Sequence, residues 1–488
     1  MLLVLDGLRP DVLRAAIRDG DAPNLGALAE RGEAVWDAVS VFPSITPAAT
    51  AAIATGRAPE GSGIVGHSWY DAAEGRTVVY GAMRETVLST GPVKVFNNNV
   101  WRMNRDHLDA PTFFEQLHER GVEGACVHFP IRRGPYRHPV RLKSVDRLSK
   151  NGRRFLGSSV DGPKEYFMGD LFHSRSTVFN GRGGSGGLRQ SAGINDEHAA
   201  NIGAMLVRDR VAPFNLVYFF KGDSIAHHFG VEAQRRWVEK ADGYVGRIFE
   251  AAGGVDAALE EYAVLSLSDH GHTPLLPLQR HVDLNAALEE AAPIGSRARL
   301  SSRKGVLAVP NGRAAFLYLG DRVEPAGVAE RLASRRGVDL AARWDGEWAV
   351  ACRLGRELRF RPAAPGRGHR DPFGRSWELR GDPYALEIGV SGEGLGYGEY
   401  PDALERLWGC LRSPRCGDVV LSATPGYTFG EVSGRFHKKS DHGSLHASDS
   451  NVFSVGCGIR PPGRITGVAP ALVAHFDDEH SGLEKRVV

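Results

Sequence analysis

Three short apolar runs along the chain each stop at an aspartate. Runs of this length, bounded by polar residues or glycine, are typical of strands that a parallel sheet buries on both faces. Because the carboxyl ends of parallel strands share one edge of a sheet, the three aspartates are expected to meet in one crevice there. For any one of them alone, the alternative is that the aspartate only starts a turn. The runs lie in MLLVLD (1–6), FNLVYFFKGD (214–223) and EYAVLSLSDHGH (261–272), and they stop at Asp6, Asp223 and Asp269.

Stretches with helical spacing of apolar residues follow two of these runs. The stretches 11–20 and 22–32 follow the first run, and each ends at a glycine, a common stop residue of helices. The stretch 231–254 follows the second run and ends at two glycines. Strands that alternate with helices predict an α/β fold with a mostly parallel central sheet flanked by helices.

The segment FPSITPAATAAIATGR (42–57) predicts a further helix. Thr46 stands at the expected cap position and Pro47 at the first helical position, and the alanines behind them favour helix. Taken alone, such a Thr-Pro pair indicates capping. The other possibility is that the Thr46 hydroxyl does chemistry at the start of this helix.

Composition and charge narrow the class of protein. The chain has 488 residues, of which 42% are hydrophobic and 24% charged, as in globular proteins of two or three domains or of one large domain with insertions. A net charge of +2 gives no field that attracts nucleic-acid polymers or a membrane surface. No apolar run has the length of a membrane span or of a signal peptide core, so we expect a cytoplasmic protein. The five scattered cysteines predict free thiols, with Cys410 and Cys416 as a pair that could join.

Histidines stand close to the aspartates in the sequence. Asp223 and His227 are four residues apart, which places both side chains on one face of a helix. His270 directly follows Asp269, and a later Asp-His-Gly motif supplies His442. Carboxylate oxygen and imidazole nitrogen are ligands that zinc, manganese and iron accept. The pattern therefore predicts a metal site without choosing among these metals.

Together these residues resemble the seven-residue site of the alkaline phosphatase superfamily. The closest resemblance is to its type I phosphodiesterase/nucleotide pyrophosphatase branch, with phosphonoacetate hydrolases nearby, and it covers residues 1–71, 213–285 and 435–476 approximately. It implies an alkaline-phosphatase-like core that holds two divalent metal ions, zinc first, with manganese or iron as alternatives. It also implies that one ion is held by Asp6, Asp269 and His270, with Thr46 on it as nucleophile, and the second by Asp223, His227 and His442.

The chain departs from this family after the nucleophile helix. Where the family usually has an asparagine that donates to a phosphoryl oxygen, the chain has His67, which either keeps that contact or has moved out of the site. Three further histidines flank the ligands and are expected to support them or to lie at the surface. Asp441 and Asp449 are expected to orient His442 or to cap a turn. The three flanking histidines are His228, His272 and His446.

Two long segments separate the motifs. The segment of about 90–205 is expected to be a loop-rich insertion, and its glycine-rich stretch 179–193 a loop, since no strand precedes it and no Gly-Lys-Ser/Thr follows. The segment 286–430 carries strand-like, helix-like and strand-like runs, which predict a smaller inserted α+β cap domain. The catalytic core would then comprise residues 1–285 and 431–488.

These observations predict a two-metal hydrolase of phosphoric esters. The first expectation is a phosphodiesterase or nucleotide pyrophosphatase that acts on a small, nucleotide-like phosphate ester through a phosphorylated Thr46. A phosphonate C–P hydrolase and a phosphomonoesterase are alternatives within the superfamily. A phosphoryl transferase and a catalytically inactive binding protein are alternatives of other classes, and the presence of all seven site residues disfavours the last. The sequence does not indicate the oligomeric state.

Overall fold

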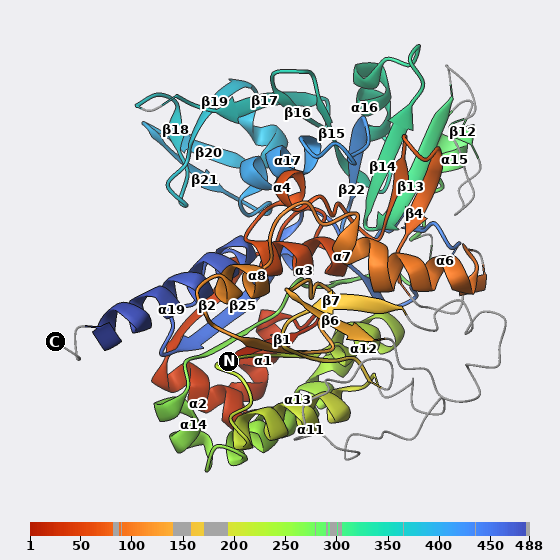
Figure 1. Cartoon of the computed structure of the whole chain (residues 1–488). Helices are drawn as coiled ribbons and strands as arrows, with labels where there is room; N and C mark the ends of the chain where they lie inside the picture. Colours follow the sequence, from red (N-terminus) through yellow and green to blue (C-terminus); the bar gives the residue numbers. More distant parts are fainter. Residues whose placement is uncertain are drawn as a thin grey trace.

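A computed structural model gives the fold of the chain (Figure 1). The residues that the structure describes are 1–81, 87–88, 90–139, 158–169, 194–278, 280–288, 291–292, 300, 305–364, 366–434 and 436–484. The glycine-rich stretch 179–193, predicted to be a loop, lies outside them.

The central sheet has seven strands and is parallel over most of its width. β1 pairs parallel with β10 and β9, β9 pairs parallel with β5, and β5 pairs parallel with β8. Near one edge, β25 pairs antiparallel with both β10 and β2, so β25 alone runs opposite to the other strands of this sheet. The prediction of a mostly parallel central sheet is therefore confirmed. In spatial order the strands are β2 (Glu33–Val39), β25 (Asn451–Cys457), β10 (Val264–Leu267), β1 (Leu2–Leu5), β9 (Phe214–Phe219), β5 (Gly124–Val127) and β8 (Glu165–Phe167).

Helices cover both faces of this sheet, as the unbroken apolar run of β1 predicts (Figure 1). Leu3 and Leu5 pack into a cluster with one helical layer, and Leu2 and Val4 into a cluster with the other. The predicted helices after the first and second runs are all present. The first layer contains α1 (Pro10–Arg18), α2 (Pro23–Arg31), α11 (Asp196–Arg208), α13 (Gln234–Glu250) and α14 (Val255–Glu261), and the second α3 (Thr46–Thr55), α8 (Phe113–His118) and α19 (Val468–Glu484).

The segment 90–205 is not a loop-rich insertion where the structure describes it, so that expectation is wrong there. β5 and β8 are strands of the central sheet, and α8 and the start of α11 belong to its helical layers. The two strands are only four and three residues long, GACV and EYF, and such short runs carry little periodic signal.

A second sheet lies beside the central one, at the top of Figure 1. It has twelve strands, all within residues 291–431, and most of its pairings are antiparallel. That residues 286–430 form a smaller inserted cap domain stays a prediction. Its members are β12 (Ala291–Ala292), β13 (Val306–Gly312), β14 (Ala314–Leu319), β22 (Val419–Ala423), β15 (Val338–Trp344), β16 (Ala349–Arg353), β17 (Arg356–Pro362), β19 (Ser376–Gly381), β18 (His369–Arg370), β21 (Gly394–Tyr397), β20 (Ile388–Ser391) and β23 (Gly430–Glu431), and α16 (Pro325–Ala333) and α17 (Ala403–Leu411) pack on it.

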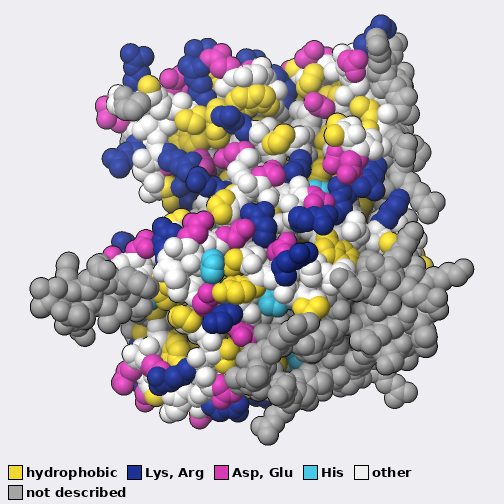
Figure 2. Space-filling model, in the orientation of Figure 1, with side chains coloured by type: hydrophobic (Ala, Val, Ile, Leu, Met, Phe, Trp, Pro, Cys, Tyr) yellow, Lys and Arg dark blue, Asp and Glu magenta, His cyan; other side chains and the backbone are white. Residues whose placement is uncertain are grey.

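The distribution of surface charges and the state of the cysteines are those that the sequence predicts. Figure 2 shows acidic and basic side chains interspersed over the face drawn, with no large area of one sign. Within the described ranges, no helix combines the length and the apolar character that crossing a membrane requires. All five cysteines are free, and the sulfur atoms of Cys410 and Cys416 lie 3.8 Å apart.

Candidate active site

The three aspartates of the apolar runs meet at one edge of the central sheet. β10, β1 and β9 are neighbours and run parallel, so the residues that follow them share this edge. Asp6 follows β1 directly and Asp269 follows β10 after one serine. Asp223 lies in the first turn of α12 (Lys221–Phe229), which follows β9. The structure therefore brings together the carboxylates that the sequence singles out.

Asp6, Asp269 and His270 form the first potential metal-binding group. Their ligand-type atoms lie within 4.8 Å of one another. His270 Nε2 is 3.4 Å from Asp6 Oδ1 and 3.6 Å from Asp269 Oδ2. Both of these carboxylate oxygens are buried, and neither has a hydrogen-bond partner among the described residues. An unsatisfied buried carboxylate oxygen is costly, so this group fits a bound cation.

The pKa of Asp6 also indicates that its carboxylate lacks a compensating positive charge. Burial, reinforced by the negative charges of Asp269 and Asp223, raises the pKa of Asp6 well above its usual value. The Tyr218 hydroxyl donates a hydrogen bond to Asp6 Oδ2, which opposes the shift without overcoming it. A dication in this group would stabilise the ionised carboxylate.

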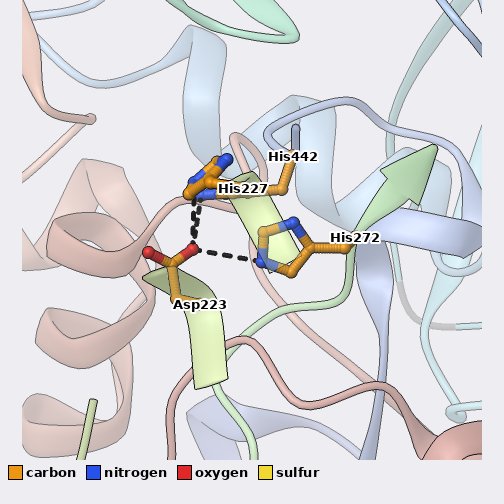
Figure 3. A group of neighbouring side chains, drawn as sticks. All are labelled: Asp223, His227, His272 and His442. Carbon is orange, nitrogen blue, oxygen red and sulfur yellow. Dashed lines mark hydrogen bonds and ion pairs between the residues drawn. The ribbon is translucent and has the colours of Figure 1, made fainter. Parts of the chain in front are cut away.

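Asp223 is the centre of the second group (Figure 3). Its Oδ1 atom lies 3.1 Å from His227 Nε2, 3.1 Å from His272 Nε2 and 3.3 Å from His442 Nε2. Asp223 and His227 share one face of α12, as their spacing predicts. Burial acts to raise the pKa of Asp223, but the charge and hydrogen bonds of the histidines outweigh it and lower that pKa well below the usual value.

The main chain fixes the tautomer of three histidines. Nδ1 of His227 donates to the Ser440 carbonyl at 2.9 Å, and Nδ1 of His442 donates to the Ser44 carbonyl at 2.9 Å. Nδ1 of His270 donates to a carbonyl at 3.0 Å in the same way. Each Nε2 atom then faces a carboxylate. A histidine whose Nδ1 is held by a carbonyl while its Nε2 faces the ligand position is the usual arrangement of metal-binding histidines.

Thr46 lies beside the first group, at the start of α3. The expectation that Thr46 is the cap residue is wrong by one position: Ile45 has the extended cap conformation, and Thr46 is the first helical residue. The extended conformation at Ile45 starts the helix without a side-chain cap. The Thr46 hydroxyl is instead 3.0 Å from His270 Nε2.

A cavity of about 250 Å³ opens over both groups. Thr46 and His67 line it together with Asn311 and Glu431 of the second sheet. Burial lowers the pKa of His67 to about 4, so this imidazole is neutral at pH 7. Asn311 accepts from the backbone N–H of Ser68 and donates to its carbonyl, both at 2.9 Å, which fixes the chain next to His67.

Two residues at this site were not singled out as ligands by the sequence. His272 was expected to support the site or lie at the surface, and it is fully buried against Asp223. The sequence gives no role to His437. Its ring stacks on that of His227 with centroids 3.5 Å apart, and its Nε2 atom is 3.0 Å from Glu431 Oε1. Its only signal in the sequence is its position five residues before His442.

His228 and His446 do not join the two groups, whereas Asp441 forms a third potential metal-binding group with His227 and His437. His228 is exposed, and His446 starts the short helix α18 (Ala447–Ser450) and pairs with Glu399. Asp441 accepts from the backbone N–H of His442 at 2.9 Å, which suits an orienting role.

The fold and the site together indicate the class of this protein. A mostly parallel sheet with carboxylate–histidine groups at the carboxyl ends of its strands is the architecture of alkaline-phosphatase-like enzymes. The chain belongs to the type I phosphodiesterase/nucleotide pyrophosphatase family, whose model matches residues 1–449. This family consists of metal-dependent hydrolases within the alkaline phosphatase superfamily. The resemblance seen in the sequence is thereby confirmed, as is the prediction of an enzyme.

Solved structures show the same fold at low sequence identity. The chain is similar to phosphonoacetate hydrolase from Sinorhizobium meliloti 1021 in complex with phosphonoformate, with a TM-score of 0.54 and 17% identity, over 97% of this chain and 94% of that one. It is also similar to murine ectonucleotide pyrophosphatase/phosphodiesterase 5, with a TM-score of 0.56 and 13% identity over the same shares. Comparison with curated protein sequences gave no match.

Proposed function

We propose that the protein hydrolyses a small, nucleotide-like phosphodiester by in-line attack of Thr46 on phosphorus. The observation that carries this proposal is the position of the Thr46 hydroxyl. It lies at the start of α3, 3.0 Å from His270 Nε2, in the cavity that Asp223 and His227 also line. A hydroxyl with only a capping role would accept a hydrogen bond from a backbone N–H in the first turn of the helix, rather than lie beside a histidine of the first group.

The residues present fit two divalent cations, as the orphaned oxygens and the directed imidazoles indicate. Asp6, Asp269 and His270 would hold one cation, and Asp223, His227 and His442 the other. Zinc suits these ligands, and manganese or iron would also be accepted. Divalent cations held here would lower the pKa of a hydroxyl and offset the charge that builds on phosphoryl oxygens.

The side chains and backbone then position the reaction. The bond from Thr46 oxygen to phosphorus forms as the ester bond to the leaving alcohol breaks. The intermediate is a phosphodiester that joins Thr46 to the remaining ester group, and water hydrolyses its bond from Thr46 oxygen to phosphorus, which releases a phosphate monoester and restores the hydroxyl. The first-turn amides of α3 and the positive end of its dipole face the phosphoryl oxygens. His67, neutral at pH 7, donates one N–H to a non-bridging oxygen.

The test compares bis-p-nitrophenyl phosphate with p-nitrophenyl phosphate, with zinc or manganese added. We expect the wild type to prefer the diester, and Thr46→Ala to lose about a thousandfold or more of its kcat. Thr46→Ser keeps a hydroxyl and serves as the matched control, so it should retain measurable turnover. Undiminished activity in Thr46→Ala would exclude a covalent intermediate on Thr46.

A phosphonate C–P hydrolase is the second candidate. The likeness to phosphonoacetate hydrolase, also solved in complex with phosphonoacetate, supports it. A cavity of about 250 Å³ is also small for a whole nucleotide and large enough for a small phosphonate. Release of inorganic phosphate from phosphonoacetate, faster than cleavage of either nitrophenyl ester, would favour this candidate. Preference for the monoester would indicate a phosphatase.

A further inference from the structure

A second cavity lies beside α12, on the face of this helix opposite to Asp223 and His227. It has a volume of about 670 Å³ and is bounded by the starts of α11 and α12 and by α13. The residues that line it are distinct from those that line the catalytic cavity. Its volume falls within the range of small-molecule pockets, roughly 300–1,000 Å³. No step of the proposed reaction uses it.

The walls of this second cavity are largely apolar. Ile225 and Phe229 of α12 form one wall, and Trp237 and Tyr244 of α13 form another. The side chain of Phe229 is 72% exposed, although phenylalanine normally favours burial. An apolar body placed in the cavity would cover it.

Positive charge surrounds the apolar walls. Lys221, Arg236 and Lys240 line the cavity and are exposed, and none of them forms an ion pair with a described residue. Asp196 and Glu197 are the carboxylates of the described lining. Asp196 accepts hydrogen bonds from the Trp237 indole and from the backbone N–H at 220, and the charge of Lys221 also acts on it. Three cations against two carboxylates leave a net positive charge, which favours an anionic ligand.

The hydrogen bonds of Asp196 also make the cavity rigid. The Trp237 indole donates to Asp196 Oδ2 at 2.9 Å and the backbone N–H at 220 donates to Oδ1 at 3.0 Å, which ties α11 to α13 and to the start of α12. Asp196 and Trp237 are both buried. A wall fixed in this way needs little reordering when a ligand enters.

We infer that this cavity is a binding site for a small amphipathic anion, an aromatic or alkyl body that carries a sulfonate, carboxylate or phosphate group. The apolar body lies against Ile225, Phe229 and Tyr244, and the anionic group lies near Lys221, Arg236 and Lys240. The occupant contacts the face of α12 opposite to Asp223 and His227. This inference does not depend on the proposed reaction.

The probe for this site is 8-anilinonaphthalene-1-sulfonate, titrated against the full chain and followed by fluorescence. We expect saturable binding at one site in the wild type. Arg236→Gln/Lys240→Gln should weaken it about tenfold or more, since two of the three cations are lost. Arg208→Gln/Arg322→Gln removes the same charge outside the cavity and should leave the affinity unchanged.

Two further arms separate the alternatives. Ala233→Trp fills the cavity and should abolish binding of the probe. Thr46→Ala should bind the probe like the wild type. The binding result therefore stands even if the catalytic proposal fails. Decyl phosphate should compete with the probe, and decyltrimethylammonium should not. Unchanged affinity in both cavity variants, or equal competition by the cationic detergent, would overturn the inference.

Discussion

His67 lines the catalytic cavity and keeps an uncharged ring. Burial is the main cause of its low pKa, about 4, and the neighbouring histidines add to it. The ring can therefore donate a hydrogen bond at neutral pH but adds no positive charge. An asparagine side chain offers the same kind of donor at a similar reach.

We therefore expect His67→Asn to retain kcat on the preferred ester within about tenfold, and His67→Ala to lose about a hundredfold or more, the usual loss of one donor to a developing oxyanion. Because His67 is already neutral above about pH 5, the pH profiles of the wild type and His67→Asn should be parallel around neutrality. Full activity in His67→Ala would show that this ring does not contact the phosphoryl group.

Asp223 presents one oxygen to three imidazoles, so its charge is expected to govern the second metal group. Asp223→Asn keeps the shape and removes the charge. We expect the purified variant to contain about one equivalent of metal less than the wild type, measured by plasma mass spectrometry after dialysis. Glu239→Gln, an exposed change on α13, is the control. A wild-type metal content in a folded Asp223→Asn would contradict the assignment.

The sequence singles out the candidate ligands better than the residues packed around them. Asp6, Thr46 and His442 belong to local patterns that a reader can match. His272 and His437 take their places only because β11 (Thr273–Pro274) pairs with β24 (Ser440–Asp441), which lies far along the chain. No local spacing encodes that contact.

At the scale of elements, α12 is held closely between α13 and the loop after β1. A side chain at Gly222 would place its Cβ 2.6 Å from the Trp237 ring and 2.7 Å from the backbone oxygen of Asp6. The helix that carries Asp223 can therefore approach the sheet only because residue 222 has no side chain.

Gly222→Ala tests this close packing. Alanine favours helix over glycine by about 1 kcal/mol, but overpacking costs about 1–3 kcal/mol, so we expect net destabilisation together with loss of activity. Gly243→Ala on α13 is the matched control, because its Cβ meets no atom within 4 Å, and it should stabilise the protein. Urea unfolding of both variants gives the comparison, and equal stability of the two would refute the argument.

The end of β5 carries a buried histidine with a strongly shifted pKa. Burial, helped by His198, lowers the pKa of His128 to about 3. The unfolded chain has the ordinary histidine pKa of about 6.5, so the native state binds fewer protons below that pH. The contribution of His128 is complete above pH 6.5 and is lost progressively as the pH falls toward 3.

His128→Asn should flatten this dependence. His128 has a positive φ of 65°, a conformation that asparagine tolerates, and asparagine does not titrate. We expect the wild type to lose more unfolding free energy than the variant between neutral and mildly acidic pH in urea titrations. Parallel losses would show that His128 does not govern acid stability.

At the scale of the whole molecule, the second sheet holds part of the catalytic site. Arg313, which follows β13, donates from its backbone to the His442 carbonyl at 2.8 Å. Its guanidinium donates to Asp449 at 2.7 Å, and both side chains are fully buried. Thr428 donates to Asp441 at 2.6 Å. The sequence did not indicate this, because strand-like runs do not show which sheet edge their turns will contact.

Arg313→Met is expected to lower the free energy of unfolding by about 3–5 kcal/mol, since it leaves the Asp449 carboxylate buried without its partner. Activity should fall with it, because His442 loses support. Arg313→Met/Asp449→Leu removes both charges and should recover most of the stability in urea unfolding. A double variant no more stable than the single one would show that the ion pair is not the cause.

Main-chain carbonyls hold the imidazoles of His442 and His227, so the sequence at these anchor positions is free to change. Every amino acid carries that carbonyl, so replacement of Ser44 or Ser440 by alanine leaves the direction of His442 or His227 intact. Substitutions at these two anchor positions therefore leave the orientation of the histidine side chains unchanged. The directions of these two imidazoles therefore do not depend on which side chain each anchor residue carries.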